Sequence, residues 1–504
     1  MELTGQPISL SQIAQIAIAR EPVAIASSAH ARIRESRAVI DAITESEAVV
    51  YGVNTGFGKL SEVHIERGDL GQLQLNLVRS HACGIGAPLS EPEVRAMMLL
   101  RANVLALGFS GIRLEVIEFL AEMLNRGVHP MIPEKGSVGA SGDLAPLAHL
   151  SLALVGEGEA FFDGGRMPSA AALSRAGLKP IRLEAKEGLA LLNGTQAMHA
   201  AGGLALLRAK RLSRVADVIG AMTLEALKGT PTAFDPRIQN ARPHPGQKAA
   251  AAHLCWLLRE SEIRESHKTG DPRVQDAYSL RCSPQVLGAV ADAIAFARTT
   301  AEIELNASTD NPLVFDNGDV LSGGNFHGQP VAQALDVLAI ALTTLQAIAE
   351  RRVERLVNPD LSQGLPAFLT ADPGLSSGYM MVQITAASLV AESRTLAMPA
   401  SIGSIPTDAN QEDFVPMGMA AAFKARRILL NAARVVAAEL LCGAQALELL
   451  RPLAPGRGVG TLYQRIRDAG IAPLGADRPP APYLERLAAR LAAGAFDPAG
   501  WGDA

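Results

Sequence analysis

The residues Gly139-Ala140-Ser141-Gly142 form a run of small side chains in the first third of the chain. Glycines at both ends allow the backbone to turn sharply, and Ser141 carries the hydroxyl of the run. Asp143 follows directly and suits the N-cap of a helix. Taken alone, these residues predict a turn at the start of a helix rather than a reactive site.

Two glycine-rich segments suggest nucleotide binding, but their spacing excludes it. Between Gly52 and Gly58-Lys59 there are five residues, where a phosphate-binding loop needs four, and Leu60 follows in place of Ser or Thr. The segment 136–142 lacks the spacing of the dinucleotide fingerprint. The sequence has no His-Glu-x-x-His motif, and its four cysteines form no Cys-x-x-Cys pair. Neither a nucleotide nor a metal ion is therefore expected.

The stretch GASGDLAPLAHL at 139–150 resembles the signature of the aromatic amino acid ammonia-lyase family. The resemblance runs from about Tyr51 to Met419 and rests on six further blocks in the family's order. These blocks are YGVNTGFG at 51–58, SHACG at 80–84, LNGTQ at 192–196, QDAYSLRC at 275–282, GNFH at 324–327 and NQED at 410–413. Chance does not produce six blocks with compatible spacing, so the chain is identified as a member of this family. Membership implies a small-molecule amino acid as substrate.

The resemblance implies a prosthetic group that the chain makes from itself. In the family, the amide nitrogen at the position of Gly142 attacks the carbonyl carbon at the position of Ala140. Loss of two waters then leaves a 4-methylideneimidazol-5-one (MIO) ring. Glycine supplies an unhindered nitrogen, Ser141 supplies the hydroxyl that is lost, and alanine lets the backbone bend tightly. The implied cofactor is thus MIO formed from Ala140, Ser141 and Gly142, without metal or nucleotide.

The resemblance also assigns roles to side chains that would otherwise be unremarkable. Tyr51 is implied as the base that removes the β-proton, which requires a pKa below the ordinary value of about 10. Arg281 is implied as the clamp for the substrate carboxylate, because a guanidinium matches a carboxylate in geometry. Without the family match, Tyr51 would anchor a turn and Arg281 would form an ion pair. The remaining implied site residues are Tyr278, beside the ring, and Asn193, Gln275 and Phe326, in the pocket.

Two positions indicate L-histidine as the substrate and urocanate as the product. Histidine-specific members of the family carry the pair found here as Ser80-His81 and the acidic residue found here as Glu412. A carboxylate that accepts from an imidazole N–H forms a charge-assisted hydrogen bond of about 1.5–3 kcal/mol. Against a phenyl ring the same carboxylate would be buried and unpaired. Met380 is expected to pack on the imidazole, and Gln411 is assigned to the same substrate site.

Two differences from the histidine-specific pattern make this region less polar. Phe414 stands where His usually follows the Glu-Asp pair, and Met398 replaces His in the segment 397–401. They leave open a histidine derivative, tyrosine or phenylalanine as substrate, and an aminomutase that returns ammonia to the β-carbon. A lyase of the fumarase type is disfavoured because its Gly-Ser-x-x-Met-x-x-Lys-x-Asn loop is absent. A non-catalytic scaffold is disfavoured because the tripeptide and the tyrosines are present.

The elements that must position these residues are predicted to be mainly helical. The chain has 504 residues, 48% apolar and only 4% aromatic, so a large core rich in alanine and leucine favours closely packed helices. Apolar residues at intervals of three and four predict a long helix over 335–356. Two more long helices are expected over 383–396 and 420–450. The predicted fold is mainly α, a long-helix bundle core with a smaller mixed N-terminal region that carries the MIO loop.

Three segments are expected along the chain. They are an N-terminal MIO-bearing domain over 1–200, a central long-helix bundle over 201–471, and a C-terminal tail with a short helix over 472–504. Local patterns in the first segment predict helices over 10–19 and 29–43, an extended piece over 48–51 and a hairpin over 160–165.

The net charge of -5 and the absence of a basic block argue against nucleic acid as a partner. The N-terminus shows no signal-peptide pattern. The apolar segment 428–450 includes Arg434, Glu439 and Glu448, which a bilayer would penalise, so no membrane partner is expected. A cytoplasmic location is predicted. The family resemblance implies a homotetramer whose active sites draw residues from three subunits.

Overall fold

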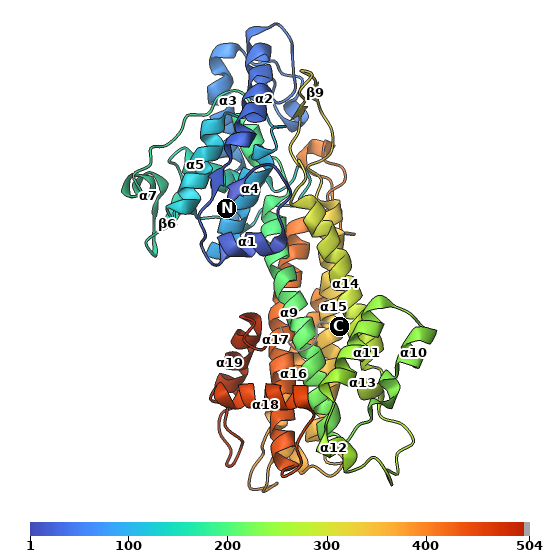
Figure 1. The fold of residues 1–504 in the computed structure, drawn as a ribbon. Coiled ribbons are helices and arrows are strands. Elements are labelled where there is room, and N and C mark those ends of the chain that lie inside the picture. The colour runs from blue at the N-terminus through green and yellow to red at the C-terminus, as the bar shows by residue number, and fades with distance from the viewer. Residues whose placement is uncertain (498–504) are drawn as a thin grey trace. The chain divides into compact units, whose positions relative to one another are not determined.

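The computed structural model describes residues 1–497 as two compact units (Figure 1). The first unit comprises Met1–Leu204, Ala297–Asp336 and Pro399–Phe423, and the rest of the chain forms the second. The three contiguous segments expected from the sequence, 1–200, 201–471 and 472–504, divide the chain differently. Both observed units are discontinuous because four long helices each begin in one unit and end in the other.

The first unit combines helices with small sheets, as expected for the mixed N-terminal region. Four sheets of two or three strands pair β1 with β2, β3 with β5, β4 with β6 and β7, and β8 with β9. The helices are α1 (Leu10–Ala17), α2 (Ser27–Glu45), α3 (Leu70–His81), α4 (Glu91–Ala106), α5 (Leu114–Asn125), α6 (Leu144–Leu154), α7 (Ser169–Arg175) and α8 (Glu187–Leu192), with 3-10 turns η1 (Gly58–Leu60), η2 (Arg67–Asp69) and η5 (Asp408–Asn410). The strands are β1 (Glu2–Leu3), β2 (Ala24–Ile25), β3 (Ile85–Pro88), β4 (His129–Pro130), β5 (Pro133–Lys135), β6 (Glu159–Phe162), β7 (Gly165–Pro168), β8 (Leu313–Val314) and β9 (Val320–Leu321).

Helix α4 forms the centre of the first unit. Every residue from Glu93 to Ala106 is buried, so the helix is enclosed by protein on all sides. Its start is fixed by a capping box, in which the Glu93 carboxylate accepts from the Ser90 N–H at 3.0 Å and from the Ser90 hydroxyl at 2.6 Å. Helices α1 and α5 pack against α4. The rigid core built in this way supports the loops that carry the polar site residues.

In the first unit, the structure matches the hairpin predicted over 160–165 but not the extended piece predicted over 48–51. The predicted hairpin is confirmed as β6 and β7, and its turn residues Asp163 and Gly164 have the left-handed φ values, +49° and +76°, that a tight hairpin turn requires. The piece over 48–51 forms no strand. Instead, the N–H groups of Val53 and Asn54 donate to the Val50 carbonyl and close a turn around Tyr51.

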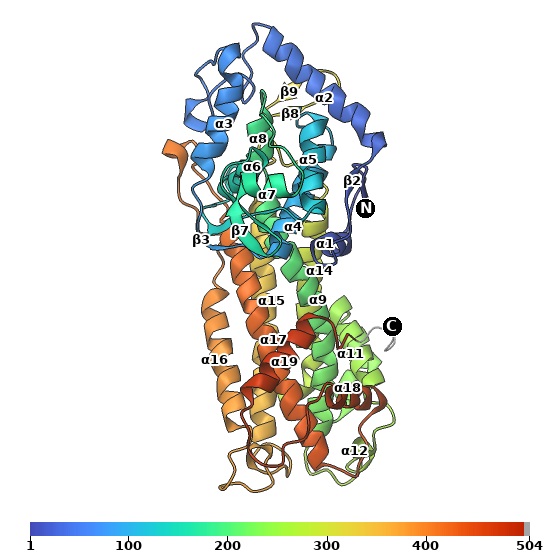
Figure 2. The same cartoon turned by 90° about the vertical axis from the view of Figure 1, so that its left-hand side faces the viewer.

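Long helices dominate the second unit and run side by side in both views (Figures 1 and 2). Its elements, including helices shared with the first unit, are α9 (Gln196–Ala226), η3 (Pro231–Phe234), α10 (Pro236–Ala241), α11 (Pro245–Leu257), α12 (Glu262–Glu265), α13 (Tyr278–Arg281), α14 (Ser283–Glu304), α15 (Gln329–Val357), η4 (Ala367–Leu369), α16 (Met380–Leu396), α17 (Gly418–Leu449), α18 (Arg457–Asp468) and α19 (Ala481–Ala492). The long helices predicted over 335–356, 383–396 and 420–450 are confirmed as α15, α16 and α17. The mainly helical fold is confirmed with them.

A fully buried ion pair links two of these long helices. The Arg352 guanidinium of α15 donates to the Glu439 carboxylate of α17 at 2.6 and 3.0 Å, and both side chains are 0% exposed. Thr223 of α9 donates its hydroxyl to the same carboxylate at 2.8 Å. Removing one partner of a buried pair leaves an uncompensated charge at a cost of about 3–5 kcal/mol. The pair therefore fixes the register of three neighbouring helices.

Helices α15 and α17 are long and apolar enough to cross a bilayer by length and composition. Most of their apolar windows, 61% and 89% respectively, are buried inside the protein. Core helices of folded proteins pass the same test, so burial against other helices accounts for their composition.

Candidate active site

The tripeptide Ala140-Ser141-Gly142 lies in a tight turn between β5 and α6. Gly139 and Gly142 pair across the turn as an isolated bridge, and both have left-handed φ values, +77° and +75°. The turn rests on Gly194, which pairs with Gly142 and accepts from the Asp143 N–H at 2.7 Å. A Cβ added at Gly142 would lie 2.3 Å from the Gly194 carbonyl oxygen. Only glycine fits this position.

The surroundings of the turn fit the ring that the family resemblance implies. Ser141 donates its hydroxyl to Glu412 Oε1 at 2.7 Å, so the group to be lost points at a carboxylate rather than at the backbone. Asn193 is 3% exposed, and its Nδ2 donates to the Asn311 carbonyl at 3.3 Å. Its Oδ1 is buried without a hydrogen-bond partner among the described residues. A buried acceptor without a partner is costly, so Asn193 is suited to a donor on a bound group.

Two cavities of the first unit share this turn as a wall. One has a volume of about 570 Å³, and six predicted residues besides Asn193 line it: Tyr51, Ala140, Ser141, Phe326, Gln411 and Glu412. The other, of about 550 Å³, is also lined by Tyr51, Ser141, Asn193 and Glu412, and it adds His81. Neither lining includes a lysine or an arginine. The structure thus brings eight of the thirteen predicted residues to one place, with Gly142 directly behind them in the turn.

Asp143 connects the tripeptide turn to the start of α9. It occupies the N-cap position of α6, but its side chain forms no capping bond to that helix. Instead, its carboxylate accepts from the Ser137 hydroxyl at 2.8 Å and from the Met198 N–H at 2.7 Å. Burial raises the pKa of the Asp143 carboxyl to about 7, although these hydrogen bonds oppose the shift. The sequence indicated the position of Asp143 but not this link.

Tyr51 lies in an environment that favours the neutral phenol. Burial raises the pKa of Tyr51 above its ordinary value, and the negative charges of Asp408 and Glu412 raise it further. A hydrogen bond from the Gly58 backbone to the phenol oxygen opposes them. The lowered pKa that a base near neutrality requires is therefore not produced by the neighbours of Tyr51 in the first unit.

A closed loop places Glu412 beside the tripeptide. The N–H of Thr407 donates to the Glu412 carbonyl at 2.8 Å, and the Thr407 hydroxyl donates to Glu412 Oε2 at 2.6 Å. Oε1 remains for Ser141. In the neighbouring cavity, His81 Nδ1 lies 2.9 Å from the Leu77 carbonyl, which can only accept, so Nδ1 donates there.

The other predicted residues, Gln275, Tyr278, Arg281 and Met380, belong to the second unit and line neither cavity. Tyr278 and Arg281 are the first and last residues of α13, and the guanidinium carbon lies 4.6 Å from the centre of the phenol ring. Tyr278 is 71% exposed, and Gln275 is exposed as well. Arg281 Nε is buried without a hydrogen-bond partner among the described residues. Tyr278 and Arg281 thus form a polar pair that belongs to the second unit.

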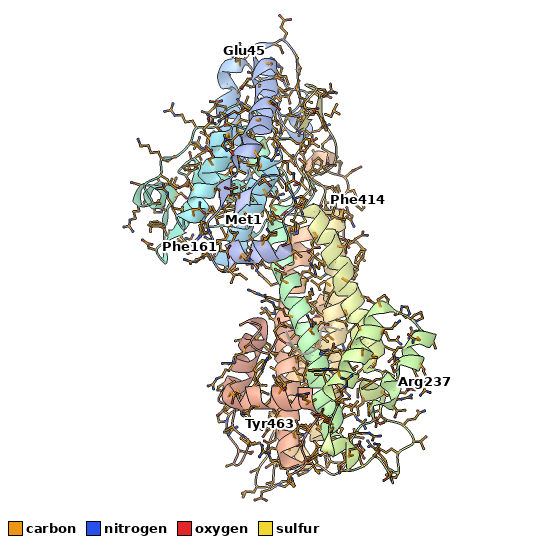
Figure 3. The ribbon with its side chains drawn as sticks, viewed as in Figure 1. Met1, Glu45, Phe161, Arg237, Phe414 and Tyr463 are labelled. Atoms are coloured by element: carbon orange, nitrogen blue, oxygen red, sulfur yellow. The ribbon has the colours of Figure 1, made fainter. Side chains whose placement is uncertain are left out.

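The two substitutions that set this chain apart from the histidine-specific pattern have different surroundings. Phe414, labelled in Figure 3, lines the same cavity as Phe326 and stacks on His327, with ring centres 6.0 Å apart and planes at 19°. His327 Nε2 lies 3.0 Å from the Phe414 carbonyl, so it carries the proton. Met398, in the second unit, is 70% exposed. Phe414 is thus part of the cavity wall.

Sequence reasoning missed two charged residues that shape the site. Arg101 is fully buried in α4 and donates to the Asn193 carbonyl at 2.7 Å, to Gln196 at 2.6 Å and to the Ala190 carbonyl. An arginine directly after the apolar run Met97 to Leu100 is a signal that would have identified it. Asp408 lines both cavities, and no sequence pattern singled it out. Within residues 1–497, no cluster of three or more His, Cys, Asp or Glu side chains could hold a metal ion.

Comparisons with known proteins agree on one family. The profile of the family described as aromatic amino acid lyase matches residues 8–468. Histidine ammonia-lyase from Myxococcus xanthus is 55% identical over 466 residues, covering 92% of this chain and 91% of that protein. The crystal structure of histidine ammonia-lyase from Trypanosoma cruzi superposes with a TM-score of 0.91 at 42% identity, covering 98% and 93% of the two chains. Tyrosine aminomutase from Streptomyces globisporus superposes with a TM-score of 0.94 at 38% identity, covering 100% and 99%.

The close packing of the tripeptide turn predicts different effects of alanine at two glycines with the same backbone conformation. Gly164→Ala adds a Cβ that meets nothing within 4 Å, so it lowers the free energy of unfolding only by the left-handed penalty of about 1–2 kcal/mol. Gly142→Ala has the same backbone penalty and adds the clash with Gly194, so it lowers the free energy of unfolding by more than Gly164→Ala does. Urea unfolding of both variants measures the difference. Equal urea midpoints for the two variants would show that Gly142 does not pack tightly against Gly194.

Proposed function

The chain belongs to the aromatic amino acid lyase family, and we propose that it eliminates ammonia from L-histidine to give urocanate with an MIO electrophile formed from Ala140-Ser141-Gly142. One observation carries the proposal: the Glu412 carboxylate reaches the tripeptide inside a cavity that Tyr51 also lines. A carboxylate there favours an aromatic side chain that offers an N–H, and imidazole has one. The relatives named as histidine ammonia-lyases support the same substrate.

Different residues of the chain bind and orient the substrate for the elimination of ammonia in this proposal. When present, the MIO ring supplies the electrophile that activates the substrate for loss of its amino group. Asn193, whose Oδ1 is an acceptor without a partner among the described residues, would accept an N–H from the ammonium group of a substrate bound beside the ring. Glu412 orients the substrate by accepting the imidazole N–H, and His81 and Gln411 complete the side-chain pocket. Phe326 lines the same cavity and excludes water.

Tyr51 removes the β-proton of the substrate in this proposal. Burial and the charges of Asp408 and Glu412 keep the phenol protonated until a positive charge approaches. The ammonium group of the substrate and the guanidinium of Arg281 supply such charges, and Arg281 also clamps the carboxylate. Because no lysine or arginine lines the two cavities, the clamp has to come from elsewhere in the protein.

We further propose a homotetramer in which each active site takes residues from three subunits. The exposed Tyr278 lies against the partly buried Arg281 in the second unit, and Gln275 and Met380 belong to that unit as well. Delivery of this group by a neighbouring subunit would give the cavity the cation that its own lining lacks. A cytoplasmic location is part of the proposal. All four cysteines are free, which suits a reducing compartment.

A second candidate is an MIO-dependent aminomutase or lyase acting on another aromatic amino acid or a histidine derivative. Phe414 favours it, because an apolar ring lies where the histidine-specific pattern has a polar one. Incubation with L-histidine separates the candidates. Appearance of the near-ultraviolet absorption of urocanate supports the first, and a β-amino acid or an aryl acrylate from another substrate supports the second.

Glu412→Gln is expected to reduce kcat/KM for L-histidine by about 10–100-fold, the value of one charge-assisted hydrogen bond. Any turnover of L-phenylalanine should fall much less, because a phenyl ring offers no N–H to the carboxylate. Steady-state rates with both substrates measure the ratio. An equal fall for both substrates would show that Glu412 does not recognise the imidazole.

If each active site takes residues from several subunits, two inactive variants should regain activity when they assemble into mixed oligomers. Tyr51→Phe and Tyr278→Phe should each lose nearly all turnover, because each removes one phenol from every site. When the two chains are co-expressed, sites that draw the two tyrosines from different subunits can be intact, and about one quarter of wild-type activity should return. Each variant expressed alone is the control. No recovery in proven mixed oligomers would mean that one chain supplies both tyrosines.

A further inference from the structure

We propose that Asp408 is a positioning residue for Tyr51. It holds in place the turn η1, next to the phenol of Tyr51, and it keeps a negative charge near that phenol until the substrate's ammonium group enters. The inference rests on the proposed function and adds a residue that none of the predicted roles included. It stands on three observations: the contacts of Asp408 with η1, the conformation of its own loop, and the charges that face the two cavities.

Asp408 accepts a hydrogen bond from η1, the turn that follows Tyr51 in the chain. Its Oδ2 accepts from the Lys59 N–H at 3.1 Å. The same oxygen would lie 2.1 Å from a Cβ added at Gly58, so the carboxylate rests directly on the Gly58 backbone. Gly58 in turn forms the backbone hydrogen bond to the phenol oxygen of Tyr51. Asp408 therefore contacts the turn η1, whose Gly58 lines both cavities with Tyr51 and acts on its phenol.

The backbone around Asp408 is held in an unfavourable conformation. Asp408, Ala409 and Asn410 have left-handed φ values of +47°, +51° and +67°. Such conformations cost about 1–3 kcal/mol for each non-glycine residue and persist where the surrounding structure enforces them. Here the bonds between Thr407 and Glu412 close the loop. The direction of Asp408 is therefore set by the same loop that places Glu412.

The charge of Asp408 acts on Tyr51 across cavities whose linings include no lysine or arginine. The titratable side chains that line the two cavities are Tyr51, His81, His327, Asp408, Glu412 and Asp413. Of the carboxylates, Asp408 and Glu412 raise the pKa of Tyr51, in addition to the larger effect of burial. An incoming ammonium group is attracted by these carboxylates and offsets their effect on the phenol. Substrate binding and deprotonation of Tyr51 are thereby coupled.

Three variants separate the charge of Asp408 from its contact with η1. Asp408→Asn removes the charge but keeps an oxygen that can accept from the Lys59 N–H. Asp408→Ala removes both. Asp413→Asn is the matched control, because it makes the same charge change in the same loop at a carboxylate that does not act on the Tyr51 pKa.

The pH dependence of kcat/KM for L-histidine is the main measurement. Activity of a base rises as pH increases through its pKa, so Asp408→Asn should move the acid limb of the profile to lower pH, and Asp413→Asn should leave it in place. Asp408→Ala should show the same move together with a lower kcat, since η1 is released. An unmoved limb in Asp408→Asn, an equal move in Asp413→Asn, or equal kcat values for Asp408→Asn and Asp408→Ala would overturn the proposal.

A titration without turnover keeps the test valid if a variant is inactive. The tyrosinate absorption that disappears in Tyr51→Phe reports the ionisation of Tyr51, and it should appear at lower pH in Asp408→Asn than in the wild type. Titration at the same pH in both would overturn the proposal. Failure of the wild type to form urocanate from L-histidine would instead refute the proposed function, so the two failures are distinguishable.

Discussion

The contact between two backbone turns is the constraint on which the site depends. Gly142 and Gly194 approach so closely that a single added carbon at Gly142 would overlap the Gly194 carbonyl. Arg101 holds the second turn from the core through the Asn193 carbonyl, and Asp143 joins the first turn to the start of α9. Two charged groups are thus buried to fix the position of small, flexible residues. The tripeptide is presented to the cavity by a rigid support, although its own sequence favours flexibility.

The electrostatics of the cavity follow from what the first unit contains. Asp408, Glu412 and Asp413 face the cavity, and no lysine or arginine does. Such a site attracts an ammonium group and opposes ionisation of Tyr51 while it is empty. Under the proposed function, Arg281 of α13, whose guanidinium lies over the Tyr278 ring, would supply the missing positive charge.

The sequence predicted the helical fold well because periodicity and alanine content are local properties of α15, α16 and α17. It also predicted eight of the residues that line the cavities, since the blocks that carry Tyr51, Asn193 and Glu412 could be recognised one by one. The division into units could not be predicted, because long helices cross the boundaries. The role of Asp408 could not be predicted from the sequence either, because it depends on a left-handed loop conformation that no local pattern of Thr407 to Glu412 encodes.

The intact mass of the purified protein shows whether the tripeptide has closed into a ring. If Ala140, Ser141 and Gly142 close into a ring with loss of two waters, the wild-type mass is about 36 Da below that of the translated sequence. Ser141→Ala, which lacks the hydroxyl, should show its full translated mass. A wild-type protein that forms urocanate at its unmodified mass would contradict the account, because the cavity residues would then act without the electrophile assigned to them.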